Sequence, residues 1–242
     1  MTPNGQFCYR CGGRRFVLAG SANDCFRCRT VPFRFKRAIV LGEYNDDLRR
    51  LILRMKTDRT GILAIAAATV LANCREADLK NAGADYIVPV PMHRLRRADR
   101  GSNSPDSIAE ELGRRLHIPV ARHLIRRACP TELQYTLSRQ ARADNVSGAF
   151  ALRAPHLLDK LCIAIKNIVQ KKRGRSAVNP FDLSGKNILL VDDILTTGAT
   201  CNEITKVLLS AGARSVIVAA LARAEGNFIA AHGGRARSDG KK

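Results

Sequence analysis

Two adjacent aspartates follow an apolar run toward the C-terminal end of the chain. In the stretch NILLVDDILTTGATCNEI, Asp192 and Asp193 come directly after residues 187–191, and a turn rich in threonine follows at residues 196–200. Backbone N–H groups in such a turn, at the beginning of a helix, bind anions such as phosphate. Two carboxylates beside the turn can hold the vicinal hydroxyl groups of a ribose, directly or through Mg²⁺. These residues therefore predict a sugar-phosphate site.

Four of the eight cysteines form two Cys-x-x-Cys pairs near the N-terminus, CYRC and CFRC. Two such pairs can place four sulfur atoms around Zn²⁺ when each pair lies on a tight turn, and Gly12 and Gly13 supply a permissive backbone for the first one. A site filled by four protein sulfurs would be structural rather than catalytic. A redox dithiol and disulfides are the alternatives. The predicted metal ligands are Cys8, Cys11, Cys25 and Cys28.

Alternating strands and helices must hold the acidic pair and the turn in place. A helix is expected over 200–211, where Thr200 and Glu203 have the spacing of a capping box, and a strand over 215–221. This alternation predicts an α/β fold with an open, doubly wound parallel sheet and helices on both faces, whose ligands bind beyond the carboxyl ends of the strands. The other expected elements are strands at 38–44 and 86–90 and helices at 46–55, 62–75 and 104–116, the last with Ser104 as N-cap and Pro105 at its first position.

The chain is strongly basic, with a formal net charge of +20 over 242 residues. Most of the excess lies in residues 1–37 and 91–187. Such a charge attracts anions, either nucleic acid or phosphorylated small molecules, and a compositional bias of the genome is the alternative source. The longest mainly apolar run, 62–71, is too short to span a bilayer, and the N-terminal residues lack an apolar signal region. We therefore expect a soluble, cytoplasmic protein with no membrane span.

The stretch ILLVDDILTTGAT resembles the motif with which type I phosphoribosyltransferases bind 5-phosphoribosyl 1-diphosphate (PRPP). The four-cysteine module, LILRMK ending at Lys56, DYIVPVPMH, RGSN and TELQ…LSRQAR..NVSGAF extend the resemblance over nearly the whole chain, to the ComF family of competence-associated proteins. The resemblance implies a type I phosphoribosyltransferase-like parallel sheet beside a zinc ribbon, and binding of PRPP with Mg²⁺. In some members it also implies a role in handling DNA taken up during transformation.

The same resemblance implies roles for individual residues. Asp192 and Asp193 would hold the ribose hydroxyls, and these two with Arg100 are the implied catalytic residues. Arg100 would lie on a mobile flap that excludes water from an oxocarbenium-like transition state. Arg139, Arg142 and Asn145 also match the family pattern. The implied substrate-binding residues are Val88, Pro89, Val90 and Pro91 for the diphosphate, Thr196, Thr197, Gly198, Ala199 and Thr200 for the 5′-phosphate, and Lys56, Arg96, Arg97 and Asn103.

The sequence departs from the family pattern in two places. After the flap arginine the family reads close to Arg-Gly-Phe-Asn-Gln, whereas this chain reads RGSNS, which leaves the flap more polar. An insertion lies between 150 and 188, and its part at 166–180 carries lysines and arginines but no acid, as a DNA contact or a plain surface loop would. We divide the chain into a zinc ribbon with a basic connector (1–37), a phosphoribosyltransferase-like domain (38–230, with the insertion at 151–187) and a disordered tail (231–242).

Two functions of different classes follow. The first is an enzyme that transfers phosphoribose to or from a nitrogenous base, with Asp192 as the candidate general base. The second is a protein without turnover that senses PRPP or a nucleotide, or binds single-stranded DNA beside other competence proteins. Few aromatic residues are present to stack on bare bases, apart from Tyr9 and Phe26 in the zinc module. The fold often forms homodimers, and no residue identifies the acceptor base.

Overall fold

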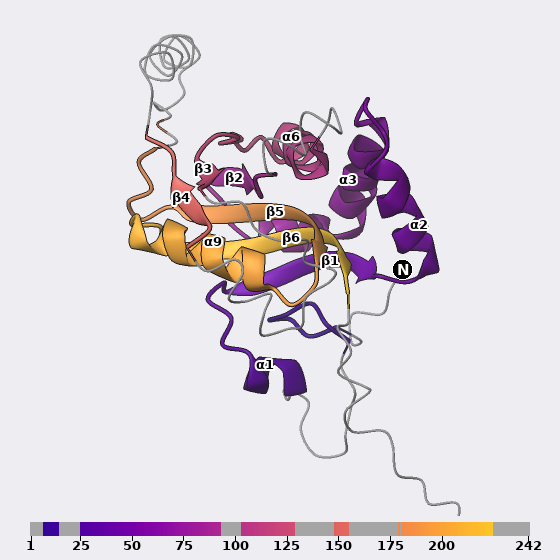
Figure 1. The fold of residues 1–242 in the computed structure, drawn as a ribbon, viewed down its shortest axis with the longest axis horizontal. Coiled ribbons are helices and arrows are strands. Elements are labelled where there is room, and N and C mark those ends of the chain that lie inside the picture. The colour runs from indigo at the N-terminus through magenta and orange to yellow at the C-terminus, as the bar shows by residue number, and fades with distance from the viewer. Residues whose placement is uncertain are drawn as a thin grey trace, which may run out of the picture.

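The computed structural model describes residues 7–14, 25–92, 103–128, 148–154, 179 and 181–224 (Figure 1). Its centre is a four-stranded sheet with the strand order β1-β6-β5-β2, and all three pairs of neighbouring strands are parallel. The predicted open parallel sheet is therefore confirmed. The strands are β1 (Arg37–Glu43), β2 (Tyr86–Pro89), β5 (Asn187–Leu195) and β6 (Ser215–Arg223).

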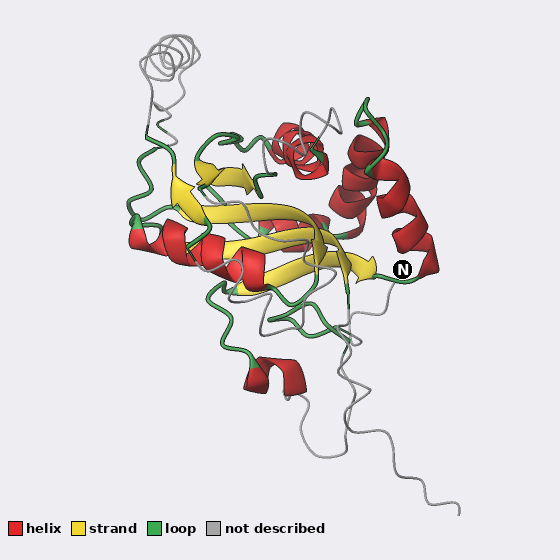
Figure 2. Ribbon diagram, in the orientation of Figure 1, coloured by secondary structure: helices red, strands yellow, loops and turns green. Residues whose placement is uncertain are grey.

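Helices cover both faces of this sheet, as the sequence predicted (Figure 2). Leu189 packs into a core cluster with α2 (Asp46–Met55), α3 (Ile62–Cys74), α4 (Glu76–Lys80) and α6 (Ser104–Leu116) on one face. Leu190, the next residue, faces the opposite cluster with α9 (Ala199–Ser210), because successive side chains of a strand point to opposite faces. No helix in the described part of the chain is both long and apolar enough to cross a membrane.

The N-terminal module, which comprises the described residues before β1 (7–14 and 25–36), packs on the same face of the sheet as α9 (Figure 1). It contains the bridge between Phe7 and Arg14 and the short helix α1 (Phe26–Thr30). Residues 32–37, predicted to form a basic connector, bury two aromatic rings, since Phe33 is 4% and Phe35 0% exposed. The connector therefore belongs to the core.

Two of the predicted helix beginnings are wrong in detail. The capping box at Thr200 does not form, because Glu203 instead accepts a hydrogen bond from the N–H of Gly148 (2.9 Å), and the N-cap of α9 is Gly198. Helix α6 begins at Ser104 with Asn103 as its N-cap, one residue before the predicted one. The sequence also gave no sign of a small antiparallel pair beside α9, formed by β3 (Ile125–Arg127) and β4 (Phe150–Leu152).

Candidate functional site

Strand β5 carries the acidic pair inside its C-terminal half. We predicted that the strand ends at residue 191, but it continues to Leu195, which pairs with Arg223 of β6. On the other side, β2 ends at Pro89, opposite Val191. Asp192 and Asp193 therefore lie beyond the end of β2 but remain in the part of β5 that pairs with β6. The loop that follows β2 can therefore lie beside the two aspartates.

That loop is the predicted diphosphate-binding segment, and the sheet register brings it beside the acidic pair. The N–H of Val90 donates to the carbonyl of Val191 at 2.8 Å. The carbonyl of Val90 accepts from the side-chain amide of Asn103 (3.4 Å), a residue only 4% exposed. Val88, Pro89 and Val90 are buried and Pro91 is half-buried. Asn103, which was predicted to contact substrate, thus contacts the loop that would do so.

Asp192 is half-buried in a polar environment. Its Oδ1 accepts the N–H of Asp193 at 2.9 Å, and its Oδ2 lies 3.8 Å from the thiol of Cys201, which is buried in α9. Burial raises the pKa of Asp192 well above its ordinary value, and the neighbouring charge of Asp193 adds to the rise. A raised pKa makes the carboxylate form of a carboxyl group a stronger base, which suits the role of general base.

The threonine-rich turn connects β5 to α9 and has the backbone that anion binding requires. Gly198 has φ = 85°, a left-handed conformation that glycine adopts without strain. The hydroxyl of Thr197 accepts from the N–H of Ala199 at 3.3 Å. The first N–H groups of a helix point beyond its beginning rather than to carbonyls of the same helix, and the positive end of the helix dipole lies there. Thr196, Thr197 and Thr200 are half-buried beside these groups.

The N-terminal module supports this turn from beneath. A Cβ on Gly198 would lie 2.8 Å from Cε1 of Phe33, so the ring and the turn are in close contact. Asn202, in the first turn of α9, accepts the N–H of Arg34 at 2.5 Å and donates to the carbonyl of Pro32 at 3.4 Å. These contacts could not be predicted, because neither segment carries a sequence pattern that indicates the other as its partner.

The four predicted metal ligands come together. Their sulfur atoms lie within 4.8 Å of one another, with Cys8 and Cys28 3.7 Å apart and Cys11 and Cys25 3.6 Å apart. Sulfurs about 2.3 Å from a tetrahedral zinc are about 3.8 Å from one another, so the cluster fits such an ion. These distances are too long for disulfides, whose sulfurs are about 2.05 Å apart. The hydrogen bond with Cys11 lowers the pKa of Cys8 to about 4, and the same contact raises the pKa of Cys11, so without a metal these thiols share protons that a bound metal would displace.

Other predicted residues are not brought to the site by the described structure. Lys56 is the C-cap residue of α2 and is half-buried, and no described hydrogen bond or ion pair joins its side chain to the β5 turn. The basic insertion segment 166–180, apart from Asn179, and the tail 231–242 lie outside the described residues. So do the remaining predicted side chains, Arg96, Arg97, Arg100, Arg139, Arg142 and Asn145.

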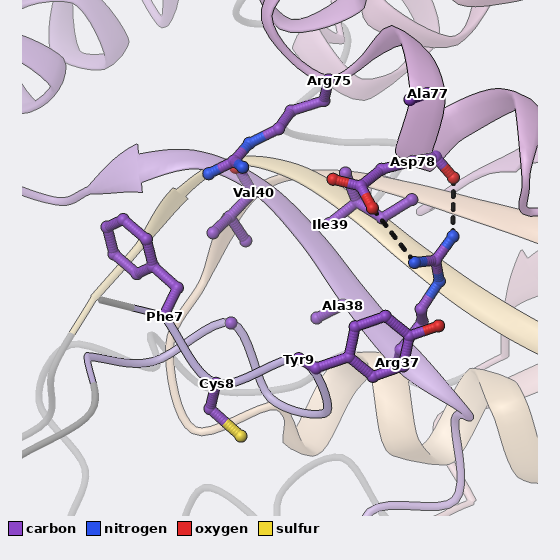
Figure 3. A pocket seen from close by; sticks show the side chains of 11 residues that line it. Phe7, Cys8, Tyr9, Arg37, Ala38, Ile39, Val40, Arg75, Ala77 and Asp78 are labelled. Atoms are coloured by element: carbon purple, nitrogen blue, oxygen red, sulfur yellow. Dashed lines mark hydrogen bonds and ion pairs between the residues drawn. The ribbon is translucent and has the colours of Figure 1, made fainter. Parts of the chain in front are cut away.

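A separate hollow of about 280 Å³ lies between the N-terminal module and the edge of the sheet at β1 (Figure 3). Tyr9 is 67% exposed on its wall, and the guanidinium of Arg37 lies 4.9 Å from the centre of its ring. Arg37 in turn pairs with Asp78 at 3.2 Å. Arg75, whose Nε donates to the carbonyl of Val40 at 2.9 Å, adds a second cation. The hollow thus offers an exposed aromatic ring beside the half-buried Arg75 and the ion pair of Arg37 with Asp78.

Comparison with known proteins identifies relatives along most of the chain. The family model for the phosphoribosyl transferase domain matches residues 117–234, which contain β5, α9 and β6. Over 224 residues the chain is 30% identical to competence protein F of Haemophilus influenzae, covering 90% of this chain and 85% of that protein. It is 28% identical over 219 residues to DNA utilization protein YhgH of Escherichia coli K12, with coverages of 89% and 83%. It is 25% identical over 221 residues to competence protein ComFC of Bacillus subtilis, with coverages of 86% and 73%.

Proposed function

Because the chain belongs to the competence protein F family, we propose that it binds PRPP together with Mg²⁺ and transfers phosphoribose to or from a nitrogenous base. One observation carries the proposal: the register of β2 against β5 brings the loop at 88–91, the acidic pair and the turn at 196–200 to one edge of the sheet. These segments have the chemistry for the diphosphate, the ribose and the 5′-phosphate of a single ligand. In an open parallel sheet, ligands bind at this edge.

Each segment has a distinct role in the proposed reaction. The N–H groups at the beginning of α9 and the hydroxyls of the turn hold the 5′-phosphate. Asp192 and Asp193 hold the ribose hydroxyls, which fixes the sugar while its C1–oxygen bond breaks. Asp192, with its raised pKa, can accept a proton from the attacking base. The backbone of 88–91 faces the leaving diphosphate. Bound Mg²⁺ would neutralise the diphosphate and ease its departure.

The first test is isothermal titration of PRPP into the purified protein with and without Mg²⁺. We expect micromolar, Mg²⁺-dependent binding by the wild type. Replacing Asp192 and Asp193 together with Asn should weaken it about 100-fold or more, because hydrogen bonds to charged groups are each worth about 1.5–3 kcal/mol. Asp182→Asn, at an exposed position away from the turn, is the control. Wild-type affinity in the double variant would contradict the site assignment.

Turnover is tested separately from binding. With PRPP and Mg²⁺ present, a panel of purine, pyrimidine and nicotinate-type bases is screened for release of diphosphate. Release with one base, lost in the Asp192/Asp193 variant, would support the enzyme. Tight PRPP binding with no release across the panel would favour a sensor that keeps the ligand site without the reaction.

A second candidate function rests on the hollow beside Tyr9. Relatives are named for competence and DNA utilization, and the chain has a net charge of +20. Exposed aromatic rings next to arginines are the stacking platforms of single-strand binding proteins. Under this second function, Tyr9→Ala should weaken binding of a fluorescent oligothymidine about tenfold, since stacking is worth about 1–3 kcal/mol per base. Tyr9→Phe keeps the ring and should bind normally. Equal binding by both variants would rule out this surface.

A further inference from the structure

Arg223 is a completely buried arginine at the last position of β6, with an exposed fraction of 0%. Its Nη1 donates to two carbonyl oxygens, those of Leu195 (2.8 Å) and Thr196 (2.5 Å). Leu195 ends β5 and Thr196 begins the predicted phosphate-binding turn. The guanidinium therefore fixes the direction of the peptide groups that lead into the turn.

The other side of the same guanidinium faces the four-cysteine cluster. Nε and Nη2 of Arg223 are buried and have no hydrogen-bond partner among the described residues. A Cβ placed on Gly13 would lie 3.5 Å from the sulfur of Cys11 and 3.9 Å from Nε of Arg223, so both atoms lie close to this small residue. Buried donors on a charged group are costly to leave unpaired, which points to an anionic partner on the cysteine side.

A metal-loaded cluster would supply that partner. Four thiolates around one Zn²⁺ leave an excess of about two negative charges. Arg27, which is 9% exposed, brings a second guanidinium to the same place, since its Cζ would lie 3.9 Å from a Cβ on Gly13. The two positive charges of Arg27 and Arg223 would balance the two excess negative charges of a zinc-loaded cluster.

We propose that Arg223 is a positioning residue that couples metal binding at the cysteines to the shape of the phosphate-binding turn. The loaded cluster attracts the guanidinium from one side, and the guanidinium holds the carbonyls of Leu195 and Thr196 from the other. The inference rests on the proposed function, because it takes the turn to be the site of the PRPP phosphate. The other contacts of the module with the turn and the beginning of α9, through the ring of Phe33 and the side-chain amide of Asn202, are made by uncharged groups.

The first experiment needs no PRPP. A chromogenic chelator is mixed with three zinc-loaded proteins, and the rate of zinc transfer to the chelator is followed. The proteins are the wild type, Arg223→Met and the control Arg214→Met, which replaces an exposed arginine just before β6. We expect zinc transfer to be about tenfold faster in Arg223→Met and unchanged in Arg214→Met. Residues that contact the metal ligands without binding the metal alter metal affinity about 10–100-fold when they are replaced. Equal rates in all three proteins would overturn the proposal.

Hydrogen exchange measures the coupling at the turn directly. Removing zinc from the wild type should speed the exchange of the amides at 196–200. In Arg223→Met that exchange should already be fast and should not respond to zinc. Arg223→Lys keeps the positive charge but loses the planar guanidinium with its several N–H donors. It should therefore retain zinc better than Arg223→Met, while the amides of the turn still exchange fast. A turn that responds to zinc equally in the wild type and in Arg223→Lys would contradict the coupling.

The last measurement joins the coupling to ligand binding. If PRPP binds, stripping zinc should weaken it about 5–150-fold in the wild type, the usual span of coupling between sites, and saturating PRPP should slow zinc release reciprocally. Arg223→Met should bind PRPP equally with and without zinc. A wild type that binds no PRPP would refute the proposed function but leave the zinc-transfer and exchange results to decide the role of Arg223.

Discussion

The ring of Phe33 lies directly against Gly198, so that the N-terminal module touches the turn proposed to bind phosphate at the residue where its backbone is left-handed. Phe33 is 4% exposed and Gly198 is also buried. The turn therefore has a packed floor rather than solvent beneath it. Any side chain at 198 must displace the ring or distort the turn.

Gly198→Ala is expected to lower the free energy of unfolding by about 2–4 kcal/mol and to abolish PRPP binding. The loss combines the strain of a Cβ at positive φ with the overlap against Phe33. Chemical denaturation and PRPP titration measure the two effects. Gly185→Ala is the control, because Gly185 has φ = 71° but no neighbour within 4 Å of the added Cβ, so it reports the strain alone.

A double-mutant cycle isolates the overlap. In the Gly198→Ala background, Phe33→Ala removes the clashing ring and should cost less stability than it does in the wild type. Equal cost in both backgrounds would mean that the ring does not restrict residue 198.

Asp192→Asn should make the protein more stable at neutral pH, although it changes a residue proposed to bind the ligand. Burial raises the pKa of Asp192, so the folded state binds this proton more tightly than the unfolded state. Stability from this group is therefore greatest at low pH and declines as pH rises above its ordinary value of 3.8. Melting temperatures across pH should show that decline in the wild type and in Asp182→Asn, and a smaller one in Asp192→Asn. A lower melting temperature of Asp192→Asn at pH 7 would contradict the prediction.

Glu111 should stabilise the protein only above acidic pH. This carboxylate, 7% exposed, accepts hydrogen bonds from Thr69 of α3 and from Arg114 and Arg115 of its own helix. The bond from Arg114 lowers its pKa from 4.5 to about 2. The stability that it contributes is therefore complete above about pH 4.5 and is lost as the pH falls toward 2.

Replacing Glu111 with Gln tests this expectation. At pH 7 we expect a loss of about 1–3 kcal/mol, as for other hydrogen bonds to charged groups. The difference from the wild type should shrink as the pH approaches 2. Glu110→Gln, which breaks only the more exposed pair with Arg122, should cost less than about 1 kcal/mol. A loss in Glu111→Gln that does not change with pH would argue against the charge as its cause.

Cys8→Ser together with Cys25→Ser should abolish zinc binding, since each change removes one of four ligands. Metal analysis of the wild type should find close to one zinc per chain. The variant should also lose the stability that zinc adds by binding the folded state, about 4 kcal/mol when free zinc exceeds its Kd a thousand-fold. Cys74→Ser, at an exposed position outside the cluster, should retain both. A wild type without zinc would remove the basis of the metal assignment.

The sequence predicted the sheet and the cysteine cluster because each has a local signal. Apolar runs predicted the four parallel strands, and the cysteine spacing predicted the cluster. The end of β5 was misplaced because the aspartates suggested that the strand stops at 191, whereas pairing with β6 continues it to Leu195. Strands β3 and β4 contain three residues each, too few for a periodic pattern.

Contacts between distant segments could not be predicted. Arg223 ends an apolar run, SVIVAALAR, and a basic residue at the end of a strand usually lies in solvent. Its burial depends on where the turn and the cysteine cluster lie, which only the folded chain determines. The same is true of Asn202 and Phe33, whose partners are more than a hundred residues away.

The placement of the N-terminal module limits how this protein can be dissected. A fragment beginning at β1 would lose Phe33 and Phe35 and uncover the apolar face formed by Val40, Val218 and Leu190. Uncovered apolar patches promote aggregation. Such a fragment would be a sheet on which α9 covers that face without the N-terminal module, and failure to purify it in soluble form would carry no information about PRPP.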